Sequence, residues 1–225
     1  VEAAPVEAAP APEAASKSKP EPAAAPRFLR AFLAVNLPVP AVRRIADEIA
    51  GMKGPIRDAG VRVSWVPPAN MHVTVKFLGP IRRDVVEGIR GALAHGLSAH
   101  TPFELEARGM GAFPSPSQPR VLWAGLREAP GLVALQQAVE GWMDELGFPR
   151  EGRAFHPHLT IGRVRADGGP LRPEAVSAIE TAIAARADLV LGGGRVTEVV
   201  LYESRTLGRG AEYHPLARVP IGAGL

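Results

Sequence analysis

Two copies of a short histidine-containing pattern offer the clearest catalytic chemistry in this chain. The segments are His72-Val73-Thr74-Val75 and His158-Leu159-Thr160-Ile161. Each contains a His, an apolar residue, a Thr and a second apolar residue, and each lies in a β-prone run. Because residues two apart point to the same face of a strand, each segment is expected to present an imidazole beside a hydroxyl. The apolar residues, Phe77 included, are expected to pack on the opposite face.

This pair of motifs suits the cleavage of a phosphodiester. In-line displacement at phosphorus needs a base on the attacking oxygen and an acid on the leaving oxygen. Since the ordinary pKa of histidine is about 6.5, one ring can be neutral while the other is charged near neutral pH. Thr hydroxyls could donate to the non-bridging oxygens, where charge develops. A single strand histidine is more often a surface or hydrogen-bonded core residue, but two copies in similar halves indicate two lobes that face one cleft.

The elements that must position these motifs alternate between strands and amphipathic helices. Gly79-Pro80 is expected to end the strand that carries His72, and the three prolines of 114–119 are expected to form a rigid loop. The predicted fold class is α+β, with two pseudo-symmetric lobes, each an antiparallel sheet with outer helices, around a central cleft. The expected strands are 28–35, 61–66, 71–78, 103–110, 121–126, 158–164, 189–191, 196–202 and 213–219, and the expected helices are 40–53, 85–93, 132–146 and 175–187.

Residues 1–26 differ in composition from the rest of the chain. They contain ten Ala and six Pro, and their only larger aliphatic residues are Val1 and Val6. Such a segment cannot bury enough apolar surface to offset the entropy lost on ordering. The sequence therefore predicts a disordered tail over 1–26 and one bilobal domain over 27–225.

Composition limits the possible environments and partners. The absence of cysteine excludes disulfides, thiol catalysis and cysteine-ligated zinc. No apolar run approaches the roughly 18 residues that a membrane span requires, and no secretory signal is evident, so a cytoplasmic protein is expected. The tail holds two Lys and four Glu, which leaves 24 basic and 19 acidic residues in the remainder. This modest positive excess, dominated by Arg, favours an anionic partner.

The sequence also resembles a known family. It looks like the 2H phosphoesterase superfamily, which is marked by two His-x-Thr-x motifs, and within it the RNA 2′,3′-cyclic phosphodiesterases, also called 2′-5′ RNA ligases. The resemblance covers roughly residues 28–219. It is carried by the segments Arg30–Val35, Trp65–Pro67, His72–Gly79, Arg120–Gly125, Phe155–Arg163 and Leu201–Ser204.

The resemblance implies a reaction and roles for individual residues. His72 would protonate the leaving ribose oxygen and His158 would activate water, leaving a 2′-phosphate, while Thr74, Thr160 and Arg163 would hold the phosphate. Strict alternation from His158 points Arg163 away from the cleft, so either the strand ends or bulges after Gly162, or Arg163 is not a ligand. The family commonly has Ala at position 162, and Gly162 would permit such a bend.

The implied partner is RNA with 2′,3′-cyclic phosphate ends, tRNA halves among them. The implied enzyme is a monomer with no metal and no cofactor, and the resemblance extends to the reverse 2′-5′ ligation.

Several residues have two interpretations. Phe32 could stack on a base but is more often core, Lys76 could contact phosphate or solvent, and Tyr202 and Ser204 could line the cleft. His156 and His158 together could hold a metal, although no further ligands complete a site. The alternative functions are a cyclic phosphodiesterase of a small nucleotide, such as an ADP-ribose cyclic phosphate, and a non-catalytic protein that binds RNA ends.

Overall fold

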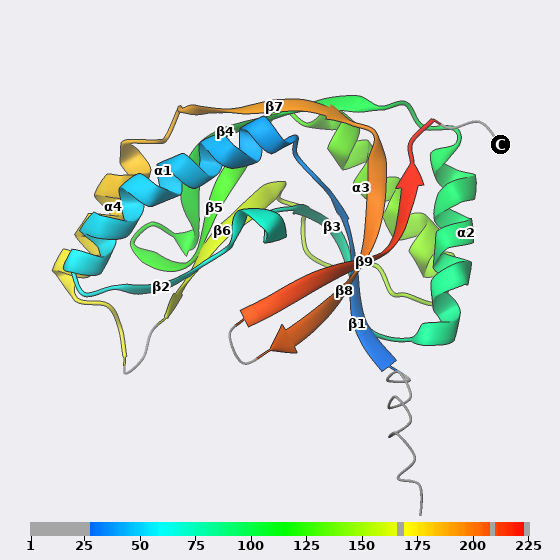
Figure 1. The fold of residues 1–225 in the computed structure, drawn as a ribbon, viewed down its shortest axis with the longest axis horizontal. Helices are drawn as coiled ribbons and strands as arrows, with labels where there is room; N and C mark the ends of the chain where they lie inside the picture. Colours follow the sequence, from blue (N-terminus) through cyan, green and yellow to red (C-terminus); the bar gives the residue numbers. More distant parts are fainter. Residues whose placement is uncertain (1–27, 166–168, 208–209, 223–225) are drawn as a thin grey trace, which may run out of the picture.

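The protein folds around one curved, predominantly antiparallel sheet. The computed structural model describes residues 28–165, 169–207 and 210–222. In this part of the chain nine strands form a sheet in the order β7-β4-β5-β6-β3-β1-β8-β9, and β2 pairs with β6 (Figure 1). The strands are β1 Phe28–Val35, β2 Arg62–Trp65, β3 Val73–Arg82, β4 Phe103–Ser115, β5 Gln118–Arg127, β6 His158–Arg165, β7 Val190–Val196, β8 Glu198–Leu207 and β9 Gly210–Pro220.

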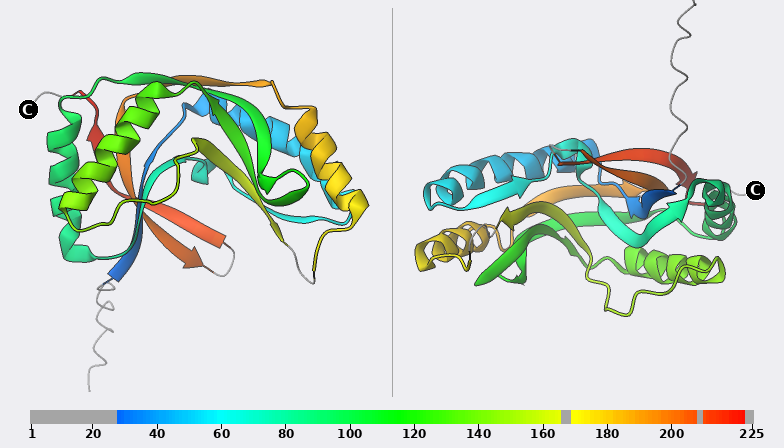
Figure 2. Two further views of the ribbon diagram at one scale, coloured as in Figure 1. Left: turned by 180° about the vertical axis from the view of Figure 1, so that it is seen from behind. Right: turned by 90° about the horizontal axis from the view of Figure 1, so that it is seen from below.

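In the described residues, four α-helices and two short 3₁₀ helices complete the fold. The helices α1 and α4 pack on each other and against β7 and β4, while α2 and α3 pack on each other and against β9 and β3. Figure 2 shows the two pairs at opposite ends of the molecule. The bounds are α1 Val39–Asp58, α2 Val86–Leu97, α3 Pro130–Glu145, α4 Pro173–Ala184, η1 Pro68–Asn70 and η2 Arg83–Val85.

The sheet divides into two halves that meet along a narrow seam. One half-sheet is β7-β4-β5-β6 and the other is β3-β1-β8-β9. They are joined where β3 pairs with β6 through Val73 and Leu159, both of which are completely buried. These are the apolar second residues of the two His-x-Thr-x motifs, so the predicted α+β fold with two lobes is confirmed and the motifs lie side by side at the seam.

The lobes are not consecutive halves of the chain. The half-sheet that contains β3 takes β1 from the N-terminal part and β8 and β9 from the C-terminal part. The other half-sheet is formed by β4 to β7 in the middle of the chain. Each lobe nevertheless receives one motif, because β3 and β6 form the two inner edges.

Helix α1 follows the predicted apolar spacing but runs further. Its buried residues include Ala41, Ile45, Ile49 and Met52 at helical intervals, and they pack into the core with Leu33 of β1. The sequence predicted an end at 53, but the helix continues through Pro55 to Asp58 because the same buried stripe extends to Ile56. Within the described residues, no helix is long and apolar enough to cross a membrane.

Two proline predictions were wrong for a common reason. Strand β3 continues through Gly79 and Pro80, which pair with Ala31 and Arg30 of β1 beside an irregularity in the ladder. Likewise Pro114 pairs with Pro119, so β4 and β5 form a long hairpin instead of ending in a rigid loop. Proline is tolerated in a strand where its missing N–H is not needed, and register shifts supply such positions.

Candidate functional site

A cavity of about 340 Å³ lies where the two half-sheets meet, and it contains the predicted site residues. Its walls come from both half-sheets and from η1, so neither lobe forms it alone. It is lined by Arg30, Ala31, Phe32, Val66, Asn70, His72, Thr74, Phe77, Gly79, Phe113, Val121, His158, Thr160, Arg163, Ser204 and Tyr213.

The two histidines are held in the same way. The Nδ1 of His72 lies 2.8 Å from the carbonyl oxygen of Asn70, and the Nδ1 of His158 lies 2.7 Å from the carbonyl oxygen of His156. In each case the partner is the residue two positions earlier. Because a carbonyl can only accept, each Nδ1 must carry the proton and donate it. The Nε2 atoms are then the ring nitrogens left to exchange a proton with a substrate.

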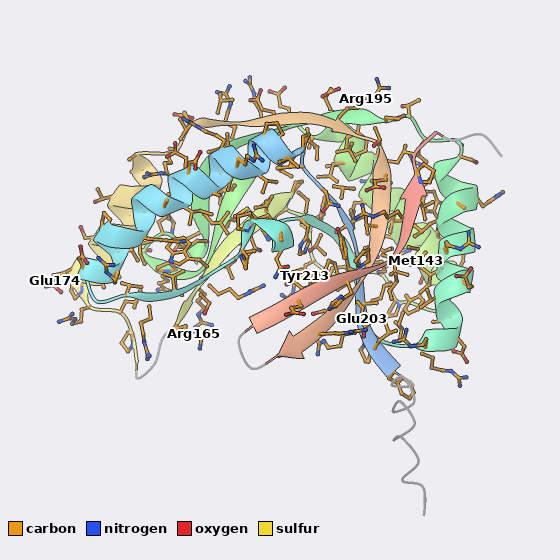
Figure 3. The ribbon with its side chains drawn as sticks, in the orientation of Figure 1. Met143, Arg165, Glu174, Arg195, Glu203 and Tyr213 are labelled. Atoms are coloured by element: carbon orange, nitrogen blue, oxygen red, sulfur yellow. The ribbon has the colours of Figure 1, made fainter. Side chains whose placement is uncertain are left out.

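The surroundings of the two rings differ. Phe32 packs against His72 with ring centroids 4.7 Å apart, and the ring of Tyr213 meets His72 edge-on at 5.0 Å. Figure 3 shows Tyr213 extending from β9 toward the centre of the molecule. Among the described residues, His158 meets a single aromatic ring, that of Phe113, edge-on at 5.0 Å.

This aromatic enclosure affects the charge of His72. Burial lowers the pKa of His72 below its ordinary value of 6.5, and the nearby His158 lowers it further, while the hydrogen bond to the Asn70 carbonyl opposes both effects. Burial acts in this direction because it disfavours the charged imidazolium. In the free protein, burial therefore favours the neutral form of His72.

A bulge in each strand explains how Arg163 reaches the cavity. In β6, Gly162 pairs with Leu122 and Thr160 with Trp123 of β5, so Ile161 is the extra residue. The bulge shifts the alternation by one position and turns Arg163 to the face that carries His158 and Thr160. The irregularity thus lies before Gly162 rather than after it. Arg163 lines the cavity, and its contact with phosphate stays a prediction.

Strand β3 has the same bulge at the equivalent position. Lys76 pairs with Leu33 and Thr74 with Ala34 of β1, so Val75, the fourth residue of the first motif, is the extra one. Phe77 is therefore the counterpart of Arg163, each five residues after its histidine. The prediction that Phe77 packs behind the strand was wrong, because the bulge turns it into the cavity wall with 71% of its surface exposed.

Gly162 is required for packing. A Cβ at this position would lie 2.8 Å from Cγ1 of Val63 and 3.1 Å from Cε3 of Trp65. Strand β2, which carries both residues, pairs with β6 at this point. The glycine therefore allows the close approach of β2, while the bulge at Ile161 provides the bend.

Comparison with known proteins places this geometry in a family. The model of the 2′-5′ RNA ligase superfamily matches residues 40–206. The chain belongs to the 2′-5′ RNA ligase superfamily. An RNA 2′,3′-cyclic phosphodiesterase from Methanothermobacter thermautotrophicus is 31% identical over 185 residues, which cover 82% of this chain and 95% of that protein. A second protein with that name, from Aeropyrum pernix, is 30% identical and covers 78% of this chain and 96% of the relative.

Solved structures agree on the fold. E. coli LigT complexed with 3′-AMP has a TM-score of 0.67 at 23% identity, covering 86% of this chain and 98% of that one. E. coli LigT complexed with ATP has a TM-score of 0.62 at 26% identity, over 86% and 98% of the two chains. The curved sheet is thus a fold that this chain shares with LigT.

Lys76 does not line the cavity that holds His72 and His158. The sequence placed Lys76 on the His72 face, but the bulge at Val75 turns it inward, where it is only 4% exposed. Its Nζ lies 2.6 Å from a carboxylate oxygen of Glu140 on α3 and 2.8 Å from the carbonyl oxygen of Pro149. Both interpretations offered by the sequence, a phosphate contact and a solvated side chain, were wrong.

His156 supplies a backbone group to the site. Its carbonyl oxygen accepts the hydrogen bond from His158, which accounts for the His-x-His spacing without a metal. In the described parts of the chain, no three His, Asp or Glu side chains come together as a metal site would require.

The lining residues that the sequence did not predict include Asn70, Tyr213, Phe113 and Arg30. Asn70 both orients His72 and donates through its side-chain amide to the Ala211 carbonyl oxygen at 2.7 Å, which ties η1 to β9. No local pattern indicates this role, since β9 is distant in sequence. Phe32, predicted as core, is indeed buried at 3% exposure but also contacts His72. Ser204 lines the cavity, whereas Tyr202 stacks on Phe32 behind it.

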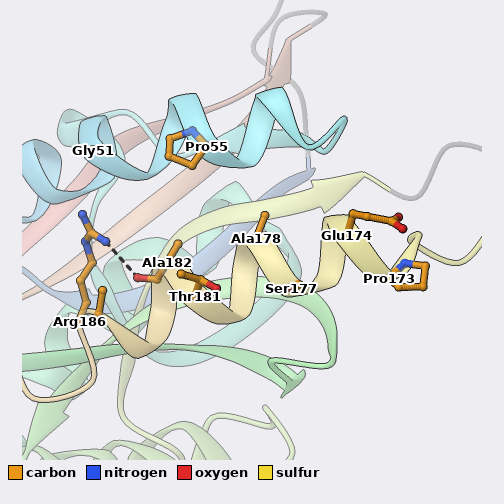
Figure 4. Close-up of a pocket in the computed structure, with 10 residues that line it drawn as sticks. Gly51, Pro55, Pro173, Glu174, Ser177, Ala178, Thr181, Ala182 and Arg186 are labelled. Carbon is orange, nitrogen blue, oxygen red and sulfur yellow. Dashed lines mark hydrogen bonds between the residues drawn. The ribbon is translucent and has the colours of Figure 1, made fainter.

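A larger hollow lies between α1 and α4 (Figure 4). It measures about 740 Å³, and its wall includes Pro55, Glu174, Thr181 and Arg186. The Arg186 guanidinium is engaged by the Ala182 carbonyl oxygen at 3.0 Å and by Glu48. The hollow contains no histidine and no pair of groups suited to acid–base work, so the seam cavity remains the candidate site.

Proposed function

We propose that this chain hydrolyses RNA-terminal 2′,3′-cyclic phosphates to 2′-phosphomonoesters, with His72 and His158 as its acid–base pair. The observation that carries the proposal is the matched anchoring of the two rings, whose Nδ1 atoms both donate to backbone carbonyls within one cavity. Each ring then offers one nitrogen for proton transfer. The relatives named RNA 2′,3′-cyclic phosphodiesterase support the choice of substrate.

The proposed reaction is a single in-line displacement. Water attacks phosphorus as one imidazole takes its proton, and the bond from phosphorus to the ribose 3′-oxygen breaks as the other imidazole protonates that oxygen. Thr74, Thr160 and Arg163 line the same cavity, and their hydroxyls and guanidinium would stabilise the charge that develops on the non-bridging oxygens. The same displacement, with a ribose 5′-hydroxyl in place of water and the 3′-oxygen again leaving, would form a 2′-5′ phosphodiester, which is a ligation.

The lowered pKa of His72 bears on which ring has which role. The resemblance assigns His72 as the acid, which must be charged, yet burial favours its neutral form. A bound phosphate opposes this, because a nearby negative charge favours imidazolium. The bell-shaped pH profile of kcat is therefore expected at higher pH than that of kcat/KM. Loss of the alkaline limb in His72→Gln, and of the acidic limb in His158→Gln, would support these roles, and the opposite pattern would exchange them.

The test of the function is turnover of three substrates side by side. These are an oligoribonucleotide ending in a 2′,3′-cyclic phosphate, a cyclic mononucleotide and an ADP-ribose cyclic phosphate. Hydrolysis of the RNA end to a 2′-phosphate is the expected result. Turnover confined to the ADP-ribose compound, or binding of the RNA end without turnover, would each contradict the proposal.

A further inference from the structure

A second cavity adjoins the catalytic one and is not used by the chemistry described above. It measures about 620 Å³ and shares Thr74, Phe77, Phe113 and His158 with the first. It is enclosed on its far side by α3 and by the segment 149–156 that leads into β6. We propose that this second cavity binds the nucleotide that precedes the cyclic-phosphate end, an inference that rests on the proposed function.

The sizes of the two cavities favour this division. The catalytic cavity, at about 340 Å³, lies at the lower end of the roughly 300–1,000 Å³ typical of small-ligand sites. It can accept little more than the terminal cyclic phosphate with its own nucleoside. RNA attached to that end must extend beyond the catalytic cavity. The second cavity directly adjoins it, and His158 itself forms part of the shared wall.

Phe77 lies at the boundary between the two cavities and offers its ring for stacking. It is the most exposed of the large apolar side chains in the described part of the chain, at 71%, and it lines both cavities. The bulge at Val75 holds it there against the usual tendency of an aromatic residue to be buried. Because every base has a π-face, an exposed aromatic ring can bind any of the four bases by stacking.

Among the described residues around the second cavity, the arginine and lysine side chains differ in whether a carboxylate pairs with them. Lys76 is engaged by Glu140, and Arg150 lies 3.1 Å from Asp144. Arg153, by contrast, is exposed, and no carboxylate of the described chain lies within ion-pair distance of its guanidinium. The carboxylate of Glu151 accepts a hydrogen bond from the Arg153 backbone N–H instead.

An available guanidinium suits the phosphodiester that joins the last two nucleotides. Phosphate contacts of this kind position a nucleic acid without reading its sequence. Together with stacking on Phe77, the contact predicts an enzyme that prefers a cyclic-phosphate end carried on an oligonucleotide over a cyclic mononucleotide, with little preference for the base.

Three synthetic substrates distinguish binding in the second cavity from binding in the catalytic cavity alone. They are a nucleoside 2′,3′-cyclic phosphate, the same compound with a 5′-phosphate, and a dinucleotide that ends in the cyclic phosphate. For the unaltered protein kcat/KM should rise along this series. If none of the three is hydrolysed, the proposed function fails; if all three react equally, only the second cavity is excluded as a nucleotide site.

Arg153→Gln provides the decisive variant, because Arg153 lines the second cavity and not the catalytic one. We expect kcat/KM for the dinucleotide to fall about tenfold, as for the loss of one charged hydrogen bond, and the value for the nucleoside cyclic phosphate to stay unchanged. Phe77→Leu keeps an apolar side chain but removes the ring, and it should lower the dinucleotide value by about tenfold, more than the mononucleotide value.

Matched arginine variants complete the experiment. Arg195→Gln removes the same charge on β7, far from both cavities, and should leave all three values unchanged (Figure 3). Arg30 lines the catalytic cavity from β1, outside the second cavity. If Arg30→Gln, rather than Arg153→Gln, selectively impairs the dinucleotide, the RNA leaves on the side of β1 and the inference is wrong.

Discussion

At the scale of single residues, the chemistry depends on how each imidazole is held. The carbonyls of Asn70 and His156 fix the proton on Nδ1 of the two histidines, and so determine which nitrogen can act. The carbonyls are in turn positioned by η1 and by the segment before β6. Removal of either imidazole should therefore affect the reaction far more than the fold.

The first prediction concerns this pair. His72→Ala and His158→Ala should each lower kcat by about 10²–10⁴-fold, the range attributed to a positioned acid or base. Steady-state rates on a cyclic-phosphate-ended oligonucleotide measure the loss, and circular dichroism checks that the variants are folded. His95→Ala, on the exposed side of α2, is the control. Near-normal turnover in either cavity variant would refute the mechanism.

A second prediction concerns the pH dependence of stability. The pKa of His72 lies below its ordinary 6.5 in the folded protein, so below that pH the unfolded chain binds the proton more readily. The free energy of unfolding should therefore decrease as pH falls through this window, and the decrease should stop below the lowered pKa of the folded state.

Urea titrations between about pH 4 and 8 measure this effect. In His72→Gln the contribution of that residue is absent, so the pH dependence should be shallower, whereas His95→Gln should leave it unchanged. An unaltered slope in His72→Gln would show that burial of His72 does not influence its protonation.

At the scale of elements, a buried ion pair ties β3 to α3 and to the approach of β6. Lys76 lies 2.6 Å from Glu140, whose carboxylate also accepts hydrogen bonds from the Glu151 backbone and the Gln136 amide. Since Glu151 lies in the segment that leads to His156, the pair connects one motif strand to the anchor of the other.

The third prediction follows from this connection. Lys76→Met should destabilise the protein by about 3–5 kcal/mol, because it leaves the buried Glu140 carboxylate without its cationic partner. The double variant Lys76→Met/Glu140→Gln should recover much of that loss, since Gln is neutral and retains hydrogen-bonding atoms.

Urea denaturation gives the free energies for this comparison. Arg90→Met breaks the exposed pair with Glu87 and is the control, since exposed pairs contribute about 0–1 kcal/mol. If the double variant is no more stable than Lys76→Met, the cost does not arise from an unpaired carboxylate.

At the scale of the whole molecule, the site exists because two half-sheets meet at β3 and β6. The second residue of each motif forms this junction, and the cavity opens beside it. The two remaining predictions concern the N-terminal segment and the effect of removing metal ions.

Deletion of residues 1–26 is the fourth prediction. Their Ala- and Pro-rich composition has no core-forming content, and they lie outside the described residues. The truncated protein should keep its Tm and its catalytic rate within experimental error, by thermal scanning and by the oligonucleotide assay. A clear fall in either would show that the segment docks on the domain.

The fifth prediction is the response to a chelator. Proton transfer by two histidines requires no metal ion, so saturating EDTA should leave the rate unchanged. A loss of activity that a divalent ion restores would favour the alternative in which His156 and His158 hold a metal.

The local sequence determined the types of residue and element in this protein. Apolar alternation and helical spacing predicted the nine strands and four α-helices of the described residues, although β3, β4, β7, β8, α1 and α2 end four or five residues beyond the predicted limits. The repeated His-x-Thr-x pattern indicated two equivalent strands around one cleft. These features follow from short-range periodicity, which a single chain displays directly. The resemblance to the superfamily added the expected chemistry.

Only the tertiary structure decided which side chains face the cavity. Strict alternation misplaced Phe77, Lys76 and Arg163, because the bulges at Val75 and Ile161 arise from pairing with neighbouring strands and leave no local pattern. Distant contacts likewise brought Tyr213 to His72. The sequence thus determined the groups available for catalysis, while strand register and long-range packing decided which of them meet, because those depend on partners far away along the chain.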